Sequence, residues 1–259
     1  MAVYYPFRIT QFPSNSGKNT FLPVPEYDNW NLDRIDRDIS RIVNCGLNGV
    51  LLAVEPSDLI DSHKLDMIKS FLVIASRNSG FKVAYLFAPA KRTQLSRSNV
   101  SSFLIKKGLL ANDSIYKFSD NNVIFFSNNV ELVSSGKPDF IYSIINVHID
   151  NKSVDTLGTI NYPALTFAYG GKERKYQISH VFAGLFLNDV DSKKPNWRIS
   201  RKKGHDFQQN LEDCCKVSPN IVILSSWNDY SQGSSIENNS LDDTQMQYIL
   251  NNFLSKYKK

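Results

Sequence analysis

Short, nearly continuous apolar runs alternate along this chain with longer amphipathic stretches. Residues 48–54 and 81–89 are two of the runs, and the stretch between them repeats its apolar residues at the spacing of a helix, from Leu65 to Ala75. A strand can be apolar at nearly every position only where both of its faces are covered. Strand, helix and strand in this order predict a right-handed β-α-β unit, and therefore a parallel sheet.

The same alternation continues to the end of the chain and predicts eight strands. They are residues 3–9, 48–54, 81–89, 122–126, 140–147, 163–169, 181–187 and 221–226. Helical patterns begin after Asn31 and Asp61, which are expected to cap their helices, and near residues 101, 205 and 241. Eight strands with helices between them favour an α/β fold, a single (β/α)8 TIM-type barrel. The tight spacing after the fourth strand predicts that some helices are short or missing.

The length of the chain agrees with one barrel. A chain of 259 residues is typical of a single α/β barrel, so we expect one domain over residues 1–259. No Gly-x-Gly-x-x-Gly or P-loop pattern follows any predicted strand. Because nucleotide-binding sheets need such loops to approach phosphates, an open nucleotide-binding sheet is not expected.

Polar side chains follow several of the predicted strands. In a barrel the carboxyl ends of the parallel strands meet at one face, where catalytic groups lie. Glu55 and Asp58 follow the second strand, Tyr169 ends the sixth, and Asp189 follows the seventh. Each has an ordinary structural alternative: a turn or cap for the two aspartates, a buried partner for Glu55, and core packing for Tyr169.

The densest group of such residues follows the last predicted strand. Four aliphatic residues, 221–224, lead directly into a polar loop, residues 226–237. The loop carries aromatic, amide and carboxylate side chains at Trp227, Asn228, Asp229, Tyr230, Gln232 and Glu237. Aromatic faces stack on sugar rings, and amides and carboxylates bond sugar hydroxyls, so the loop is a candidate carbohydrate site.

The loop sequence Ser-Trp-Asn-Asp-Tyr-Ser-Gln-Gly-Ser-Ser-Ile-Glu resembles the signature loop of glycoside hydrolase families 99 and 71 and of the related WbsX-like polysaccharide proteins. Tyr5, in a Tyr-Tyr-Pro sequence, likewise resembles the opening strand of those families. The resemblance implies a (β/α)8 barrel in which the first acid of the loop acts as base and the second as proton donor. Asp229 stands at the first position. Gln232 stands at the second, where an amide cannot donate a proton as a carboxylic acid does.

The resemblance therefore implies a glycoside hydrolase that uses Asp229 with a second carboxylate. Glu237 and Glu55 are the first candidates for that carboxylate, and Asp189 is another. The expected substrate-binding residues are Trp227, Asn228, Tyr230, Gln232, Tyr169, Asp189 and Tyr5. The implied substrate is an α-mannan, an α-glucan or a surface polysaccharide, cleaved internally. Two alternatives stay open: a sugar-binding protein that has lost hydrolysis, and a WbsX-like protein of polysaccharide biosynthesis.

Charge and cysteine content change this picture little. The net charge is +5, and the 30 basic residues are spread along the chain. Nucleic-acid binders concentrate charge on one face, so no nucleic-acid partner is expected. No window approaches the roughly 20 apolar residues of a membrane span.

The amino terminus also lacks the pattern of a signal peptide. We therefore expect a cytoplasmic protein, or a secreted one if an upstream signal sequence is removed. The three cysteines and four histidines have no metal-ligand spacing, so neither metal nor cofactor is expected. The sequence leaves the oligomeric state open.

Overall fold

The computed structural model describes residues 1–7, 30–133, 140–145, 164–170, 173–183, 185–187, 196–199, 201, 204–229, 234–239 and 243–257. The helices are α1 (Leu32–Asn44), α2 (Ser62–Ser76), α3 (Arg97–Lys106), α4 (His205–Lys216) and α5 (Gln245–Tyr257). The strands are β1 (Ala2–Tyr4), β2 (Gly49–Val54), β3 (Lys82–Phe87), β4 (Thr93–Ser96), β5 (Lys117–Phe118), β6 (Asn121–Ser127), β7 (Val130–Val133), β8 (Ile141–Ile145), β9 (Ala164–Gly170), β10 (Glu173–Phe182), β11 (Leu185–Leu187), β12 (Asn196–Ile199) and β13 (Ile221–Ser225).

Eight strands follow one another around a closed sheet in their chain order: β1, β2, β3, β6, β8, β9, β10 and β13. A short ninth strand, β5, lies antiparallel beside β6. This order confirms the predicted (β/α)8 barrel. Within the described residues no helix stands between β6 and β10, in agreement with the expectation of missing helices.

The chain divides into two compact units. Unit 1 contains Met1, Trp30–His148 and Thr166–Ile178. Unit 2 contains Ala2–Asn29, Ile149–Leu165 and Ser179–Lys259. The single domain expected over residues 1–259 stays a prediction.

In unit 1, β2, β3, β6 and β8 form a parallel sheet. The register aligns Leu52 with Tyr85 and Tyr85 with Ile124. Every residue of β2 is buried, which accounts for its apolar run. At Gly49 a Cβ atom would lie 2.3 Å from the carbonyl oxygen of Lys82 on the neighbouring strand, so only glycine fits where β2 begins.

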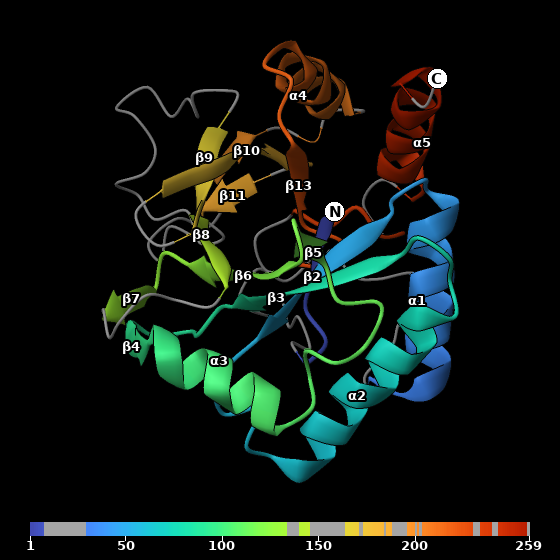
Figure 1. The fold of residues 1–259 in the computed structure, drawn as a ribbon. Helices are drawn as coiled ribbons and strands as arrows, with labels where there is room; N and C mark the ends of the chain where they lie inside the picture. Colours follow the sequence, from blue (N-terminus) through green and yellow to red (C-terminus); the bar gives the residue numbers. More distant parts are fainter. Residues whose placement is uncertain are drawn as a thin grey trace. The chain divides into compact units, whose positions relative to one another are not determined.

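The helices α1 and α2 lie side by side in unit 1 (Figure 1). Each begins at the cap that the sequence predicts. The Asn31 side chain accepts a hydrogen bond from the Arg34 amide at 2.9 Å, and Asp61 accepts one from the Lys64 amide at 3.0 Å. These bonds satisfy amide groups that have no partner within the helix. The buried apolar residues of the two helices are Ile35, Ile39, Ile42, Leu65, Ile68, Phe71, Leu72, Ile74 and Ala75.

Two strands differ from the expectation. β9 pairs with β8 in antiparallel orientation, through Tyr142 and Tyr169, where parallel neighbours were expected. The run 181–187 is not one strand, because β10 ends at Phe182 and β11 pairs with β12 in a separate two-stranded sheet. An apolar run indicates burial, but it does not fix where a strand ends or in which direction it runs.

In unit 2, β1 pairs in parallel with β13, with Ala2 level with Leu224. The helices α4 and α5 pack against each other. Their buried residues are Phe207, Asn210, Leu211, Cys214, Met246, Ile249, Leu250 and Phe253. Gly204, directly before α4, has a φ of 72°, a left-handed backbone conformation that strains any residue with a Cβ atom, so this position favours glycine.

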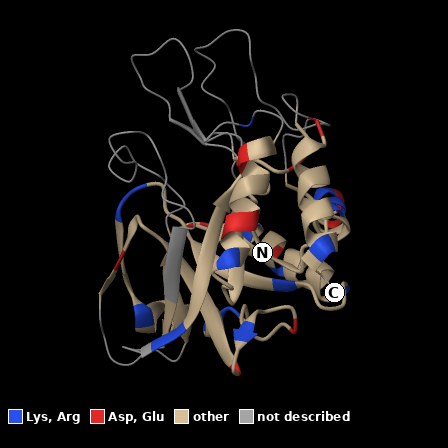
Figure 2. Ribbon diagram, turned by 90° about the horizontal axis from the view of Figure 1, so that it is seen from above, with Lys and Arg blue, Asp and Glu red and all other residues tan. Residues whose placement is uncertain are grey.

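Positive and negative side chains are interspersed along the helices (Figure 2). The pair Lys216–Asp213 on α4 has a distance of 2.6 Å, and Lys69–Asp66 on α2 has 3.8 Å. Exposed pairs of this kind contribute little to stability, because water and salt screen the attraction between their charges. In the part of the chain that the structure describes, no helix has both the length and the apolar character needed to cross a membrane.

Candidate functional site

Backbone hydrogen bonds close the loop that follows β13. The Trp227 amide bonds the Val3 carbonyl at 2.8 Å, which ties the loop to the strand β1. The Trp227 carbonyl in turn accepts bonds from the Ile236 and Glu237 amides, at 3.0 and 2.8 Å. The peptide bond between Ser225 and Ser226 is cis. Residues 226–229 and 234–237 thus form the fixed base of the loop, and residues 230–233 connect its two sides.

Asp229 belongs to this base of the loop. Its amide donates to Ser226 Oγ at 2.7 Å, and its carbonyl accepts from the Ser234 amide at 3.2 Å. Only 2% of the residue is exposed. The backbone on both sides is therefore held, and the carboxyl group is placed in a largely water-free environment where electrostatic interactions are strong.

Glu237 lies at the other end of the same loop. It is fully buried, and its carbonyl accepts a hydrogen bond from Asn239 Nδ2 at 2.9 Å. Because Glu237 and Asp229 belong to two sides of one closed loop, the structure brings both predicted acids onto one hydrogen-bonded segment.

Asn228 and Tyr5 bind each other. The Tyr5 amide donates to Asn228 Oδ1 at 2.8 Å, and Asn228 Nδ2 donates to the Tyr5 carbonyl at 2.9 Å. Both residues are buried. An amide side chain has two N–H donors and an oxygen with two lone pairs. Asn228 uses one donor and one lone pair to position the backbone at Tyr5, directly after β1.

We expect Asn228→Ala to lower the free energy of unfolding by about 2–4 kcal/mol. The substitution removes two buried hydrogen bonds, one to the Tyr5 amide and one to the Tyr5 carbonyl. Urea denaturation measures the change. The control Asn99→Ala, at an exposed position of α3, should stay within about 0.5 kcal/mol of the parent. Equal losses in the two variants would contradict the role given to Asn228.

Trp227 was expected to offer a stacking face, but its side chain is fully buried. Its indole Nε1 has no hydrogen-bond partner among the described residues. A buried ring contributes a large apolar area to the interior. The Trp227 ring therefore belongs to the buried interior of the protein, and its expected role as a stacking face stays a prediction.

Glu55, half-buried in unit 1, connects the carboxyl ends of two strands. Its Oε1 accepts a hydrogen bond from the Ala90 amide, beyond β3, at 3.2 Å. The Glu55 amide donates to Asp58 Oδ2 at 2.8 Å, and Lys64 Nζ lies 2.6 Å from Asp58 Oδ1. Asp58 is therefore a turn residue, the structural alternative named for it, while Glu55 Oε2 has no hydrogen bond within the described residues.

Tyr169 was expected to lie with Glu55 at the carboxyl end of the parallel strands. Tyr169 pairs with Tyr142 on β8. From Tyr142 the register runs to Ile124 on β6, then to Tyr85 on β3 and to Leu52 inside β2. Its ring lies 6.1 Å from the Tyr142 ring, and Tyr169 is 37% exposed. The antiparallel direction of β9 points its carboxyl end away from the carboxyl ends of the parallel strands, and the expected grouping of Tyr169 with Glu55 stays a prediction. Three further predicted residues, Tyr230, Gln232 and Asp189, lie outside the described residues.

His180 on β10 is a buried polar residue that the sequence reading left without a role. It is 4% exposed, and its ring packs edge-on against Phe182 at 6.2 Å. Burial lowers the pKa of His180 to about 4, so the imidazole is neutral at physiological pH. Its alternation with Ile178 and Phe182 was the available signal of an inward position.

Within the described ranges, no three His, Cys, Asp or Glu side chains are arranged to hold a metal ion.

We expect His180 to make the stability depend on pH. The folded-state pKa is depressed from the ordinary value of 6.5. As the pH falls from 6.5 toward 4, the unfolded chain binds a proton that the folded chain does not, so the free energy of unfolding decreases. The difference corresponds to about 3 kcal/mol. Denaturation at pH 7 and pH 4 should show a smaller loss in His180→Phe, and an unchanged loss in the control His205→Gln. A parent-like loss in His180→Phe would contradict this assignment.

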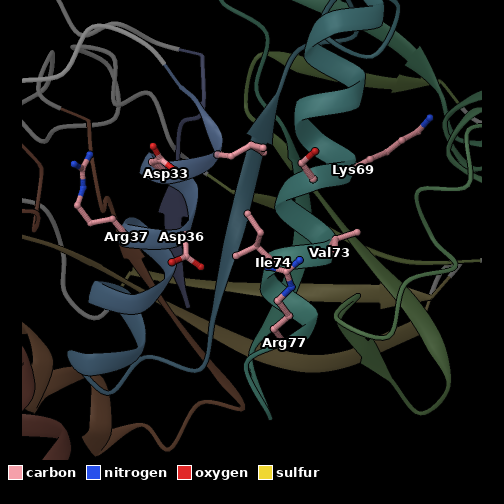
Figure 3. Close-up of a pocket in the computed structure, with 9 residues that line it drawn as sticks. Asp33, Asp36, Arg37, Lys69, Val73, Ile74 and Arg77 are labelled. Atoms are coloured by element: carbon pink, nitrogen blue, oxygen red, sulfur yellow. The ribbon is translucent and has the colours of Figure 1, made fainter.

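A separate hollow of about 690 Å³ lies between α1 and α2 (Figure 3). Asp33 and Asp36 stand on its α1 wall, and Lys69 of α2 and Arg77, directly after α2, stand on the opposite wall. Ile74 points between the two helices. The hollow contains none of the residues predicted for the site, and its polar groups come from helix surfaces, so we assign it no catalytic role.

Comparison with protein-family models finds no match, and no curated protein sequence matches the chain. Solved structures do resemble it. The GH99 endo-α-mannosidase from Bacteroides thetaiotaomicron in complex with BIS-TRIS-propane has a TM-score of 0.68 at 12% identity, over 99% of this chain and 96% of that chain. A second structure of GH99 endo-α-mannosidase from this organism has a TM-score of 0.66 at 11% identity, over 99% and 96%. A glycoside hydrolase-like protein has a TM-score of 0.64 at 11% identity, over 99% and 92%.

These likenesses define the class of fold. The chain is a (β/α)8 barrel of the kind found in GH99 glycoside hydrolases, and the resemblance expected from residues 226–237 is confirmed at the level of structure. At 11–12% sequence identity, structural similarity establishes the fold. The activity depends on the particular residues of this chain.

Proposed function

We propose that this protein is a glycoside hydrolase that cleaves a polysaccharide, with Asp229 as its main catalytic carboxylate. The observation that carries the proposal is the closed loop after β13, which holds Asp229 and Glu237 in buried positions. In barrel enzymes the segment that follows a strand is the part that supplies catalytic groups. The similarity of the fold to GH99 endo-α-mannosidase supports the same class of reaction.

Hydrolysis of a glycosidic bond uses two carboxyl groups, one ionised and one protonated, at separations of roughly 5 to 9.5 Å. We assign the ionised role to Asp229. Glu237 is our first choice for the proton donor, because it lies on the same closed loop as Asp229 and is buried there with it. Glu55 is the second choice, because its Oε2 accepts no hydrogen bond from the residues that the structure describes.

The names of the similar solved structures indicate which polysaccharides to test. Two of them are endo-α-mannosidases, so α-mannan is the first polymer to test, followed by α-glucans and capsular polysaccharides. A sugar-binding protein without hydrolysis is the second candidate function, and the amide at Gln232 favours it. A role in building a polysaccharide, as in WbsX-like proteins, would require a different assay.

The experiment is to incubate the purified chain with this panel and to measure new reducing ends, with glycan-array binding in parallel. We expect hydrolysis of at least one polymer, into oligosaccharides rather than monosaccharides. Glu237→Gln and Glu55→Gln then distinguish the two proton donors. Binding to the array with no reducing ends from any polymer would replace the hydrolase by the sugar-binding protein.

A further inference from the structure

Two tyrosine rings lie on the outer face of the sheet in unit 1. Along β8 the residues alternate: Ile141, Ser143 and Ile145 are buried, whereas Tyr142 is half-buried and Ile144 is 44% exposed. Side chains at alternate positions point to opposite faces of a sheet, so Tyr142 and Ile144 face away from the core. Tyr169, the cross-strand neighbour of Tyr142, is 37% exposed, and the two rings are inclined at 37°. Together they form a small aromatic surface.

Arg97, the first residue of α3, borders this surface. Its guanidinium carbon lies 5.1 Å from the centre of the Tyr142 ring, and Nη1 lies 3.4 Å from the Tyr142 hydroxyl. No carboxylate among the described residues forms an ion pair with Arg97, and its buried Nε has no hydrogen-bond partner there. A cross-strand tyrosine pair is explained by sheet packing. The Arg97 guanidinium is compensated only in part, because Nη1 bonds the Tyr142 hydroxyl while no described carboxylate neutralises its charge.

We propose that Arg97, Tyr142 and Tyr169 form a binding surface for an acidic sugar unit of a polysaccharide. The exposed Tyr169 ring would stack on the apolar face of the sugar, and the Arg97 fork would hold its carboxylate through paired hydrogen bonds. That the ligand is a sugar rests on the proposed function, while its negative charge follows from Arg97. The net charge of +5 would also favour an anionic polymer.

Affinity electrophoresis and calorimetry with sodium alginate, a polyuronate, and dextran, a neutral polymer, test this surface. We expect alginate to bind and dextran to bind much more weakly. Arg97→Gln and Tyr169→Ala should each weaken alginate binding about 10-fold, the size expected for one charge-assisted contact. Arg97→Lys should lie between Arg97→Gln and the parent, because lysine keeps the charge without the fork. Tyr248→Ala, at an exposed tyrosine of α5, is the matched control and should bind as the parent does.

The outcomes separate this surface from the loop after β13. Asp229→Asn should bind alginate normally, so loss of hydrolysis and loss of alginate binding are independent results. Thermal unfolding of each variant shows whether it is folded, and if Arg97→Gln is not, Tyr169→Ala and Arg97→Lys carry the test. Absence of alginate binding, equal binding of dextran, or parent-like affinity in both Arg97→Gln and Tyr169→Ala would overturn the proposal.

Discussion

Asp229→Asn should reduce hydrolysis by at least about 100-fold, the lower limit of the contribution of a general base. Asparagine has nearly the same shape, but it can neither accept a proton from water nor carry the negative charge that the reaction needs. The parent and the variant are compared by initial rates of reducing-end formation on the polymer that the parent cleaves. Because the backbone at Asp229 is bonded to Ser226 and Ser234, we expect substrate binding to survive.

The control for this substitution is Asp213→Asn on α4. The Lys216 ammonium beside Asp213 lowers the pKa of that carboxyl group, so the control also removes an ionised carboxylate, but at a helix surface. It should leave the rate unchanged. If the folded Asp229→Asn variant is nearly as active as the parent, Asp229 has no catalytic role. Glu237 and Glu55 would then be the candidate catalytic carboxylates.

The parallel part of the barrel could be predicted because burial on both faces leaves a clear trace in the sequence. Residues 48–54 and 81–89 became β2 (Gly49–Val54) and β3 (Lys82–Phe87), each shorter than its apolar run. The direction of β9 left no such trace. An apolar strand has the same composition whichever way it runs, and only the pairing of Tyr169 with Tyr142 shows the reversal.

The position of the candidate loop could also be predicted, but the burial of its side chains could not. The position of residues 226–237 after an apolar strand identified the loop that carries Asp229 and Glu237. The backbone hydrogen bond from Trp227 to Val3 joins segments that are far apart in the sequence, and local spacing cannot predict it. The same holds for Asn228, whose partner Tyr5 is 223 positions away.

Gln232→Glu should increase hydrolysis, and the rise should be about 100-fold to 10,000-fold if the missing general acid is the only defect. Glutamine and glutamate have nearly the same shape, so the substitution changes proton donation more than fit. The base of the loop is held by bonds that do not involve residue 232, among them Ile236 to Ser226 and Ser234 to Asp229. We therefore expect the affinity for the polymer to change little.

The response of the rate to Gln232→Glu also decides between the proton donors. If Glu237 or Glu55 already supplies the proton, the parent is active and a second acid at position 232 adds little or interferes through like charge. If neither does, the parent is nearly inactive, and the new carboxyl group restores a rate that Asp229→Asn abolishes again in the double variant. Gln232→Asn, which shortens the side chain and stays neutral, is the matched control and should give no increase. A variant Gln232→Glu that binds the polymer and remains inactive would exclude the absent acid as the reason for inactivity, and it would favour the sugar-binding protein.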